Sequence, residues 1–251
     1  MIETPNSDDI EPNLIYEFIL KDKKDVNMLD VGVGGAVALK YINNKSINYV
    51  GIDKNERLIN ILSKEKNVRY YTQDITHILE KKFEEKFDLC VASHIIEHLE
   101  TNKVNIFIKN LIKTIKKKKK SEIWIITPNK DVINKYNKKP TNPYHTYEYT
   151  FSELKKLFEP YKEIEAEYFG LMNLNEQKFK DLKTKKVIFI NLILKNKNIR
   201  YFISLIISKK IRSYLTDLII SKSKEEDYKI VKKNIDISEN ILIKFKLLNV
   251  K

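Results

Sequence analysis

Apolar runs and helix-like patterns alternate along the first half of the chain. Short apolar runs that suit buried strands lie at 26–32, 48–53, 68–74, 87–93 and 122–129. Apolar residues at helical spacing occur before and between these runs, at 13–20, 36–42, 56–65, 75–83 and 104–115. Strict alternation of strands and helices predicts right-handed β-α-β units, and therefore a parallel sheet with helices on both faces.

The pattern loosens after residue 129. A loop rich in Pro, Asn and Tyr spans 131–150, and a helix is predicted at 150–161, with Thr150 or Ser152 as its N-cap and Pro160 just past its end. Two more strands are predicted at 163–170 and 240–248. We therefore expect one α/β domain over 1–251, with a seven-stranded, mostly parallel sheet. Its core would be 13–170 with 240–248, and 171–239 would form a helical insertion or cap before the last strand.

The first predicted strand leads into a glycine-rich turn, "LDVGVGGA". Gly32 and Gly34 allow a sharp turn and a close approach of the backbone to a ligand, and the next helix presents free N–H groups there. Asp53 ends the second strand, where a carboxylate can accept hydrogen bonds from ribose hydroxyls. Asp74 ends the third strand and suits an adenine amino group. Asp30, just before the glycines, suits either holding the turn or binding a cationic amino group.

Two ligand classes compete for this turn. The dinucleotide fingerprint needs Gly or Ala at its sixth position, where this chain has Val37. The adenosylmethionine pattern needs an acidic residue followed by three alternate glycines. The chain supplies Asp30, Gly32 and Gly34, and only the last glycine is replaced, by Ala36. The second pattern is the better match.

With two further motifs, "FDLCVASHIIEHL" and "TPN…NPYHTYEYTFSEL", the chain resembles class I S-adenosylmethionine-dependent methyltransferases over 13–170 and 240–248. The resemblance implies a Rossmann-like class I methyltransferase fold, with S-adenosylmethionine as the cofactor. It implies these cofactor-binding positions: Asp30, Gly32 and Gly34 at the methionine end, Asp53 at the ribose, Asp74 and Ile75 at the adenine, and Ser93 and His94 beside the donor methyl group.

The segment "CVASHIIEHLE" also contains His-x-x-Glu-His, the zinc-binding pattern of one class of metallopeptidases. That pattern binds zinc when both histidines share one face of a continuous helix. Here the preceding apolar run places His94 where strand becomes loop, so His94 and His98 need not share a face. We therefore expect no metal. We expect Glu97 and His98 to hold the start of the following helix against the loop that binds the cofactor, the glycine-rich turn at 32–35.

His94 and His145 are the candidate catalytic residues, because both are expected at the cofactor edge of the sheet. A hydroxyl acceptor needs a base that titrates near neutral pH, which suits histidine. The chain has no Asn/Asp-Pro-Pro-Tyr motif for methylating amines after the fourth strand. We therefore expect O-methylation with His94 or His145 as the base. The surrounding Tyr144, Tyr147 and Tyr149 suit either packing or stacking against a sugar or nucleotide ring.

The formal net charge of the 251-residue chain is +13, which favours anionic partners. Almost all the basic residues are lysines, which argues against nucleic acid, because arginine dominates phosphate and base recognition. We expect a small saccharide or an anionic acceptor, a phosphate- or nucleotide-bearing precursor in the biosynthesis of capsule or surface polysaccharide. The alternatives are an RNA, protein, lipid or quinone methyltransferase, an adenosylmethionine-binding module without catalysis, and a nicotinamide oxidoreductase.

The basic, apolar segment 184–221 has three interpretations: a helical cap over the acceptor pocket, a surface for anionic membranes, or a homodimer interface. The single cysteine, Cys90, excludes an internal disulfide and favours a reducing compartment. No apolar stretch reaches the length of a bilayer span, and the N-terminus is acidic. We expect a cytoplasmic protein, with peripheral contact to the inner membrane face as the variant that 184–221 suggests.

Overall fold

The computed structural model describes residues 10–42, 46–64, 68–133, 139–140, 142–174 and 228–248. The chain divides into two compact units, one formed by residues 1–172 with 230–251 and the other by 173–229. The sheet core and the candidate site described below belong to the first unit. Most of the second unit lies outside the described residues.

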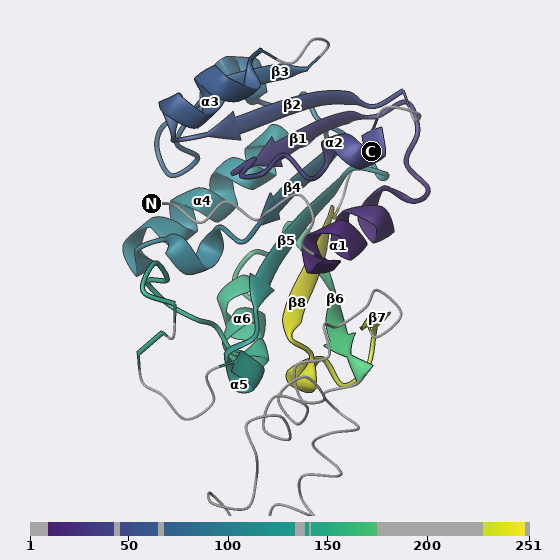
Figure 1. Cartoon of the computed structure of the whole chain (residues 1–251), viewed down its shortest axis with the longest axis vertical. Coiled ribbons are helices and arrows are strands. Elements are labelled where there is room, and N and C mark those ends of the chain that lie inside the picture. The colour runs from purple at the N-terminus through teal and green to yellow at the C-terminus, as the bar shows by residue number, and fades with distance from the viewer. Residues whose placement is uncertain are drawn as a thin grey trace, which may run out of the picture. The chain divides into compact units, whose positions relative to one another are not determined.

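In the described part of the chain the strands form one eight-stranded sheet, in the order β3-β2-β1-β4-β5-β8-β6-β7 (Figure 1). The strands are β1 Asn27–Val31, β2 Asn48–Asp53, β3 Arg69–Thr72, β4 Leu89–Ser93, β5 Glu122–Pro128, β6 Ile164–Asn173, β7 Tyr228–Val231 and β8 Asn240–Leu247. Neighbours among β1 to β5 pair in parallel, whereas β8 runs antiparallel between β5 and β6. This confirms the mostly parallel, Rossmann-like sheet, whose ligand edge is the carboxyl ends of the parallel strands.

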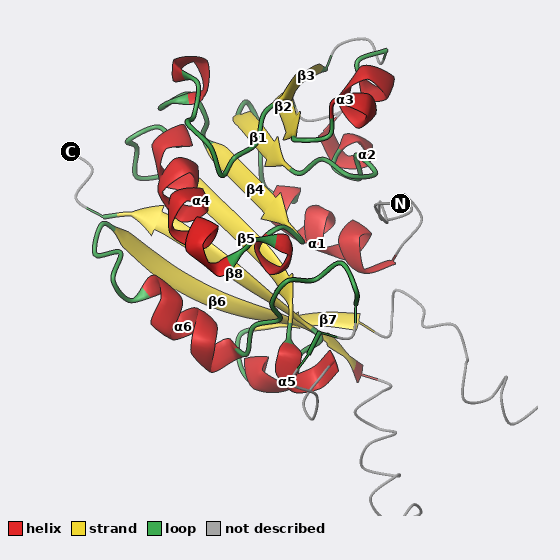
Figure 2. Ribbon diagram, turned by 90° about the vertical axis from the view of Figure 1, so that its left-hand side faces the viewer, coloured by secondary structure: helices red, strands yellow, loops and turns green. Residues whose placement is uncertain are grey.

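Helices cover both faces of this sheet, with α4 and α6 on one face and α1, α2 and α3 on the other (Figure 2). The helices are α1 Ile10–Leu20, α2 Leu39–Ile42, α3 Glu56–Leu62, α4 Thr101–Thr114, α5 Lys130–Ile133 and α6 Phe151–Phe158, with 3-10 turns η1 Lys81–Phe83, η2 Ile96–His98 and η4 Ile235–Ile237. The predicted N-cap of α6 is confirmed, because Thr150 forms a reciprocal capping box with Glu153.

Two predicted helices are shorter than expected. The helix expected at 36–42 begins only at Leu39, because Ala36 takes a left-handed conformation (φ 52°) that continues the glycine turn. The segment 75–83 is helical only in η1. The Asn110 side-chain amide donates to the carbonyl oxygens of Ile75 and His77, both at 2.7 Å, and this contact from α4 holds the segment in another conformation.

The sheet also has one strand more than expected. The extra strand is β7, within the segment 171–239 that was expected to be helical, and β6 continues to Asn173. Residues 175–227, including all of 184–221, lie outside the described residues, so the predicted cap stays a prediction. Among the described residues, no helix is both long and apolar enough to cross a bilayer.

Candidate active site

The glycine turn after β1 has the conformation that its sequence predicts. Gly32 and Gly34 have positive φ angles of 72° and 46°, and the Gly32 N–H donates to the Ile52 carbonyl at 2.8 Å. A Cβ added to Gly32 would lie 2.0 Å from Ile95 Cδ1 in the loop after β4. Glycine at position 32 is therefore required both by the backbone conformation and by the close packing of these two loops.

Asp30 lies fully buried beneath this turn. Its Oδ1 accepts a hydrogen bond from the Tyr16 hydroxyl at 2.8 Å, and its Oδ2 accepts one from the Tyr49 hydroxyl at 2.9 Å. Burial raises the pKa of Asp30 to about 7, although the two hydroxyl donors oppose the rise. Through these two hydrogen bonds Asp30 ties α1 and β2 to the end of β1, directly before the glycine turn.

Asp53 lies beside the glycine turn, as the sequence predicts. Its Oδ1 accepts the Asn55 N–H at 2.8 Å. Partial burial raises its pKa, and the neighbouring backbone N–H groups of Asn55 and Gly34 only partly offset that rise. The structure therefore brings Asp53 and Gly34 together at the carboxyl ends of β1 and β2.

Asp74 forms a local turn just beyond β3. Its Oδ1 accepts from the Thr76 N–H at 2.8 Å and from the Thr76 hydroxyl at 2.7 Å, and its Oδ2 lies 3.2 Å from His77 Nδ1. Burial raises the pKa of Asp74, but the Thr76 hydrogen bonds and the positive charge of His77 outweigh burial, so the net pKa is lowered. Ile75 packs into the core with 5% of its surface exposed.

His94 is the residue where β4 becomes loop, as expected. It has a left-handed φ of 55°, uncommon for a residue with a side chain, and its N–H donates to the Ile126 carbonyl at 2.9 Å. Ser93, half-buried, precedes it at the end of β4. Strained backbone of this kind costs about 1–3 kcal/mol and is often found at functional sites.

His94 and Glu97 form an ion pair, with His94 Nδ1 3.2 Å from Glu97 Oε1. Glu97 is fully buried, and its Oε2 accepts from the Thr127 hydroxyl at 3.1 Å. Burial lowers the pKa of His94, but the hydrogen bond and charge of Glu97 outweigh it, so the net pKa is raised. Burial raises the pKa of Glu97, whereas the hydrogen bond and charge of His94 lower it by more. Both directions favour the charged pair.

His145 forms a second pair of the same spacing, with its Nδ1 3.0 Å from Oε1 of the buried Glu148. This pair lies in the loop after β5, next to the loop after β4. The Thr146 and Tyr147 N–H groups donate to the Glu97 carbonyl at 2.8 and 3.1 Å, and the Thr146 hydroxyl donates to the His98 carbonyl at 3.1 Å. The two loops that carry the candidate catalytic histidines are therefore joined.

This contact changes the role expected for Glu97 and His98. Their carbonyl groups hold the loop after β5, and Ile95, in the same segment, packs against Gly32 of the glycine turn. The ring of His98 also lies 5.0 Å from the ring of His145, edge to face. Sequence reasoning missed this association, because nothing in the spacing of residues 98 and 145 predicts it.

The tyrosines near His145 differ in their surroundings. Tyr149 is buried, and the Tyr147 hydroxyl donates to Glu153 Oε1 at 2.6 Å, so these two rings pack. Tyr144 has 49% of its surface exposed and is the one of the three that is free to stack against a ligand.

The surface has two hollows away from these residues. One, of about 610 Å³, lies along α6 and β6, and the other, of about 300 Å³, lies at the amino ends of β1 to β3. No predicted site residue lines either hollow.

A family model described as "Methyltransferase domain" matches residues 28–118, which carry the glycine turn, the three strand-end acids and the His94–Glu97 pair. The chain therefore contains a methyltransferase domain of the class I fold, with S-adenosylmethionine as its cofactor. No protein of curated function matches the methyltransferase in sequence.

Solved structures share the fold of the methyltransferase. An S-adenosylmethionine-dependent methyltransferase from Archaeoglobus fulgidus is 18% identical with a TM-score of 0.55, covering 94% of this chain and 92% of the other. The [4+2]-cyclase SpnF is 12% identical with a TM-score of 0.56, covering 96% and 81%. The small RNA methyltransferase HEN1 is 14% identical with a TM-score of 0.58, and the match covers 98% of this chain but only 26% of HEN1. Likeness at these identities shows the fold alone.

Proposed function

We propose that the methyltransferase methylates a hydroxyl oxygen of a small acceptor, a saccharide or a phosphate- or nucleotide-bearing precursor of a glycan. One observation carries this proposal: His94 and His145, on adjacent loops at the ligand edge, each have Nδ1 beside a buried carboxylate three residues later. An ionised carboxylate only accepts hydrogen bonds, so Nδ1 must donate to it. In the neutral imidazole Nε2 then keeps its lone pair and can accept the hydroxyl proton.

The donor site proposed for this reaction lies at the glycine turn. The turn fits an adenosyl ligand because Gly34 has a positive φ angle and no side chain to block a ligand, and because Asp53 lies beside Gly34. We assign Asp30 and the glycines to the methionine end, Asp53 to the ribose, Asp74 and Ile75 to the adenine, and Ser93 with His94 to the methyl end. When bound, S-adenosylmethionine supplies a methyl group on a positively charged sulfur. The chain then has to orient the acceptor, exclude water and take up one proton.

The acceptor class is supported by the surroundings of the two histidines. Tyr144 offers an exposed ring in the same loop as His145, and aromatic faces stack well on sugar and nucleotide rings. The net charge of +13 favours an acceptor that carries phosphate or another anionic group. Nearly all of that charge is lysine, which supplies point charges rather than the bidentate contacts of arginine.

The test is methyl transfer from labelled S-adenosylmethionine to a panel of free saccharides, nucleotide-linked sugars and short RNAs. We expect label in a saccharide or nucleotide-sugar fraction. His94→Ala and His145→Ala are then measured on that acceptor, and loss of a general base lowers turnover by roughly 10²- to 10⁴-fold. Donor affinity, measured by calorimetry, should stay within about twofold in His145→Ala, which removes no residue assigned to the donor. In His94→Ala, which removes a residue assigned to the methyl end, donor affinity should fall far less than turnover.

His77→Ala is the matched control, because His77 also pairs with a carboxylate three residues away but lies with 67% of its side chain exposed. It should keep full turnover. If neither His94→Ala nor His145→Ala lowers turnover while donor binding is intact, the base assignment is wrong. If only RNA is labelled, and binding to RNA weakens steeply with salt, the small-molecule acceptor is wrong.

A further inference from the structure

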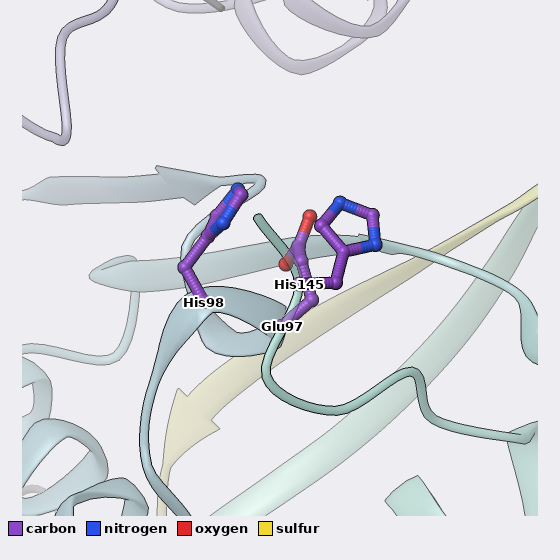
Figure 3. Close-up of side chains that lie close together, drawn as sticks. All are labelled: Glu97, His98 and His145. Atoms are coloured by element: carbon purple, nitrogen blue, oxygen red, sulfur yellow. The ribbon is translucent and has the colours of Figure 1, made fainter. Parts of the chain in front are cut away.

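We propose that Glu97, His98 and His145 bind one divalent cation of the first transition series, such as Zn²⁺, Co²⁺ or Mn²⁺. One ligand atom from each of the three side chains lies within 4.8 Å of the others. Figure 3 shows the Glu97 carboxylate between the two imidazole rings, with His98 and Glu97 from η2 and His145 from the loop after β5. Two imidazoles and one carboxylate form a set of ligands that such cations prefer.

Both imidazoles are held in the tautomer that a cation needs. His98 Nδ1 lies 2.9 Å from the Tyr144 carbonyl oxygen, and His145 Nδ1 lies 3.0 Å from Glu148 Oε1. A carbonyl oxygen and a carboxylate only accept hydrogen bonds, so both Nδ1 atoms donate. The lone pair of each neutral ring is therefore on Nε2. Metal-binding histidines are typically oriented in this way, by a carbonyl or carboxylate at the other ring nitrogen.

The buried carboxylate of Glu97 has one oxygen, Oε1, that lacks a well-aligned hydrogen-bond donor within the described part of the chain. Its side chain is fully buried, and among the described residues no group donates a well-aligned hydrogen bond to Oε1, although His94 Nδ1 lies 3.2 Å away. A buried carboxylate oxygen without a good donor is costly. A cation at this position would add a well-aligned contact to Oε1, beside the charge that His94 already supplies.

The backbone around the three side chains is already fixed. Three hydrogen bonds, from the Thr146 N–H, the Tyr147 N–H and the Thr146 hydroxyl, fasten the loop of His145 to the carbonyls of Glu97 and His98. Zinc-to-ligand distances of about 2.1 Å place neighbouring ligand atoms roughly 3 to 3.5 Å apart. A separation of at most 4.8 Å can therefore close by side-chain rotation. Because His98 is exposed, further coordination positions face solvent, as in catalytic metal sites.

The role of this cation rests on the proposed O-methylation. An acceptor hydroxyl that binds an open coordination position loses its proton more readily, because the cation stabilises the alkoxide. His145 would then be a ligand and could not accept the proton. The base role would belong to His94, which is not among the three ligands and lies beside Glu97.

From the sequence we expect no metal because the zinc-peptidase pattern involves only the pair His94 and His98. The cluster instead pairs His98 with His145 from the next loop, and it uses the glutamate of the His-x-x-Glu-His segment as a ligand. A zinc-peptidase pattern on one helix and a cation site across two loops have different requirements. The first needs helical spacing, and the second needs the contact between the loops.

The experiment measures cation binding without donor or acceptor, so that its failure is distinguishable from failure of the proposed function. The full chain is treated with a chelator, dialysed, and titrated with Co²⁺ by absorbance and with Zn²⁺ by calorimetry. We expect one equivalent to bind. Affinity should fall at least tenfold in His145→Ala and in His98→Gln, whose amide N–H can still donate to the Tyr144 carbonyl. His94→Ala and the surface control His77→Ala should bind as the wild type does.

Two outcomes would overturn the site. One is no stoichiometric binding of either cation by the wild type. The other is equal affinity in the wild type, His98→Gln and His145→Ala, which would show adventitious binding elsewhere. Circular dichroism identifies a variant that fails to fold. Because His98 is exposed, His98→Gln should keep the fold. Its cation affinity therefore tests the site even if His145→Ala fails to fold. Loss of turnover in His94→Ala with unchanged cation binding would separate the base from the ligands.

Discussion

The two halves of the ligand edge are built differently. The half to which we assign the donor, at the ends of β1 to β3, contains Asp30, Gly32, Gly34, Asp53 and Asp74. The half to which we assign the acceptor, after β4 and β5, contains His94, Glu97, His98, His145 and Glu148. We refer to them as the donor half and the acceptor half. In the donor half the backbone shape selects glycine, and neighbouring donors satisfy the carboxylates. In the acceptor half each imidazole is held through Nδ1, which leaves Nε2 available. The donor half is suited to recognition by shape, and the acceptor half to chemistry by side chains.

The largest effect is expected for Gly32→Ala. A left-handed alanine costs about 1–2 kcal/mol and overpacking against Ile95 about 1–3 kcal/mol more, so the free energy of unfolding should fall by about 3 kcal/mol. Calorimetry should show S-adenosylmethionine affinity reduced by roughly 100-fold, since the turn that approaches the ligand must shift. Donor binding and stability should therefore fall together.

Gly35→Ala is the matched control, because Gly35 does not have a positive φ angle. Gly35→Ala should lower the free energy of unfolding and the affinity for S-adenosylmethionine much less than Gly32→Ala does. Adding Ile95→Ala to Gly32→Ala should recover the packing part of the loss and leave the conformational part. If Gly32→Ala keeps full donor affinity, backbone shape does not select the ligand in the donor half.

The second prediction concerns the buried carboxyl of Asp30. Its folded pKa of about 7 lies above its ordinary value of 3.8, so between these pH values the folded state binds a proton more tightly than the unfolded state. The contribution of Asp30 to the free energy of unfolding therefore decreases as pH rises through this window and levels off above pH 7. From pH 5 to pH 8, the wild type should lose about 2 kcal/mol more than Asp30→Asn.

Urea unfolding of both proteins at pH 5 and pH 8 measures this difference. Tyr16 and Tyr49 can still donate to the amide oxygen in Asp30→Asn, so the variant should fold. An identical pH dependence in the two proteins would mean that Asp30 is not titrating in this range. Weaker donor affinity in a variant that is more stable at pH 8 would show that the carboxylate is kept for binding at a cost in stability.

The donor half could be predicted in detail from the sequence because its determinants are local. A buried strand, two glycines and a strand-end aspartate fix the turn at Gly32 and the place of Asp53 through short-range geometry. Where a longer-range contact intervenes, the prediction is wrong. Asn110 of α4 binds the carbonyls of Ile75 and His77, so a segment with helical periodicity is mostly not a helix.

The acceptor half could be predicted only in part. The strand-to-loop change at His94 follows from the apolar run before it, and the structure confirms it. The contact between His98 and His145 depends on hydrogen bonds from the Thr146 and Tyr147 N–H groups to the Glu97 carbonyl, and any residues except proline could supply those groups. Backbone contacts leave no pattern in the side chains, so sequence reasoning found both histidines but not their association.

The third prediction tests whether the donor half also needs side-chain chemistry. Asp53→Asn keeps an oxygen that can accept the Asn55 N–H, so the fold should be unchanged. Loss of one hydrogen bond to a charged group costs about 1.5–3 kcal/mol, so donor affinity should fall by roughly 10- to 100-fold. Asp22→Asn, on an exposed turn before β1, is the control and should bind the donor normally. Unchanged affinity in Asp53→Asn would remove the ribose assignment.

The smallest effect is expected for Ala36→Gly, which completes the glycine pattern of adenosylmethionine-binding turns. Ala36 has a φ of 52°, a conformation that costs a residue with a Cβ about 1–2 kcal/mol. Glycine removes this cost, but it raises the conformational entropy of the unfolded chain, which destabilises the folded protein by about 0.4–1 kcal/mol. The change also removes a buried methyl group, which is a further loss of stability. The free energy of unfolding in urea should therefore change by less than about 1 kcal/mol.

Ala38→Gly separates these contributions, because Ala38 is equally small and fully buried but has no positive φ. It should lose about 1 kcal/mol or more, since it gains no relief of strain. The difference between the two variants measures the strain at Ala36. Equal losses would show that the left-handed conformation there is free of cost. Shape would then constrain the donor half less strictly than the clash at Gly32 indicates.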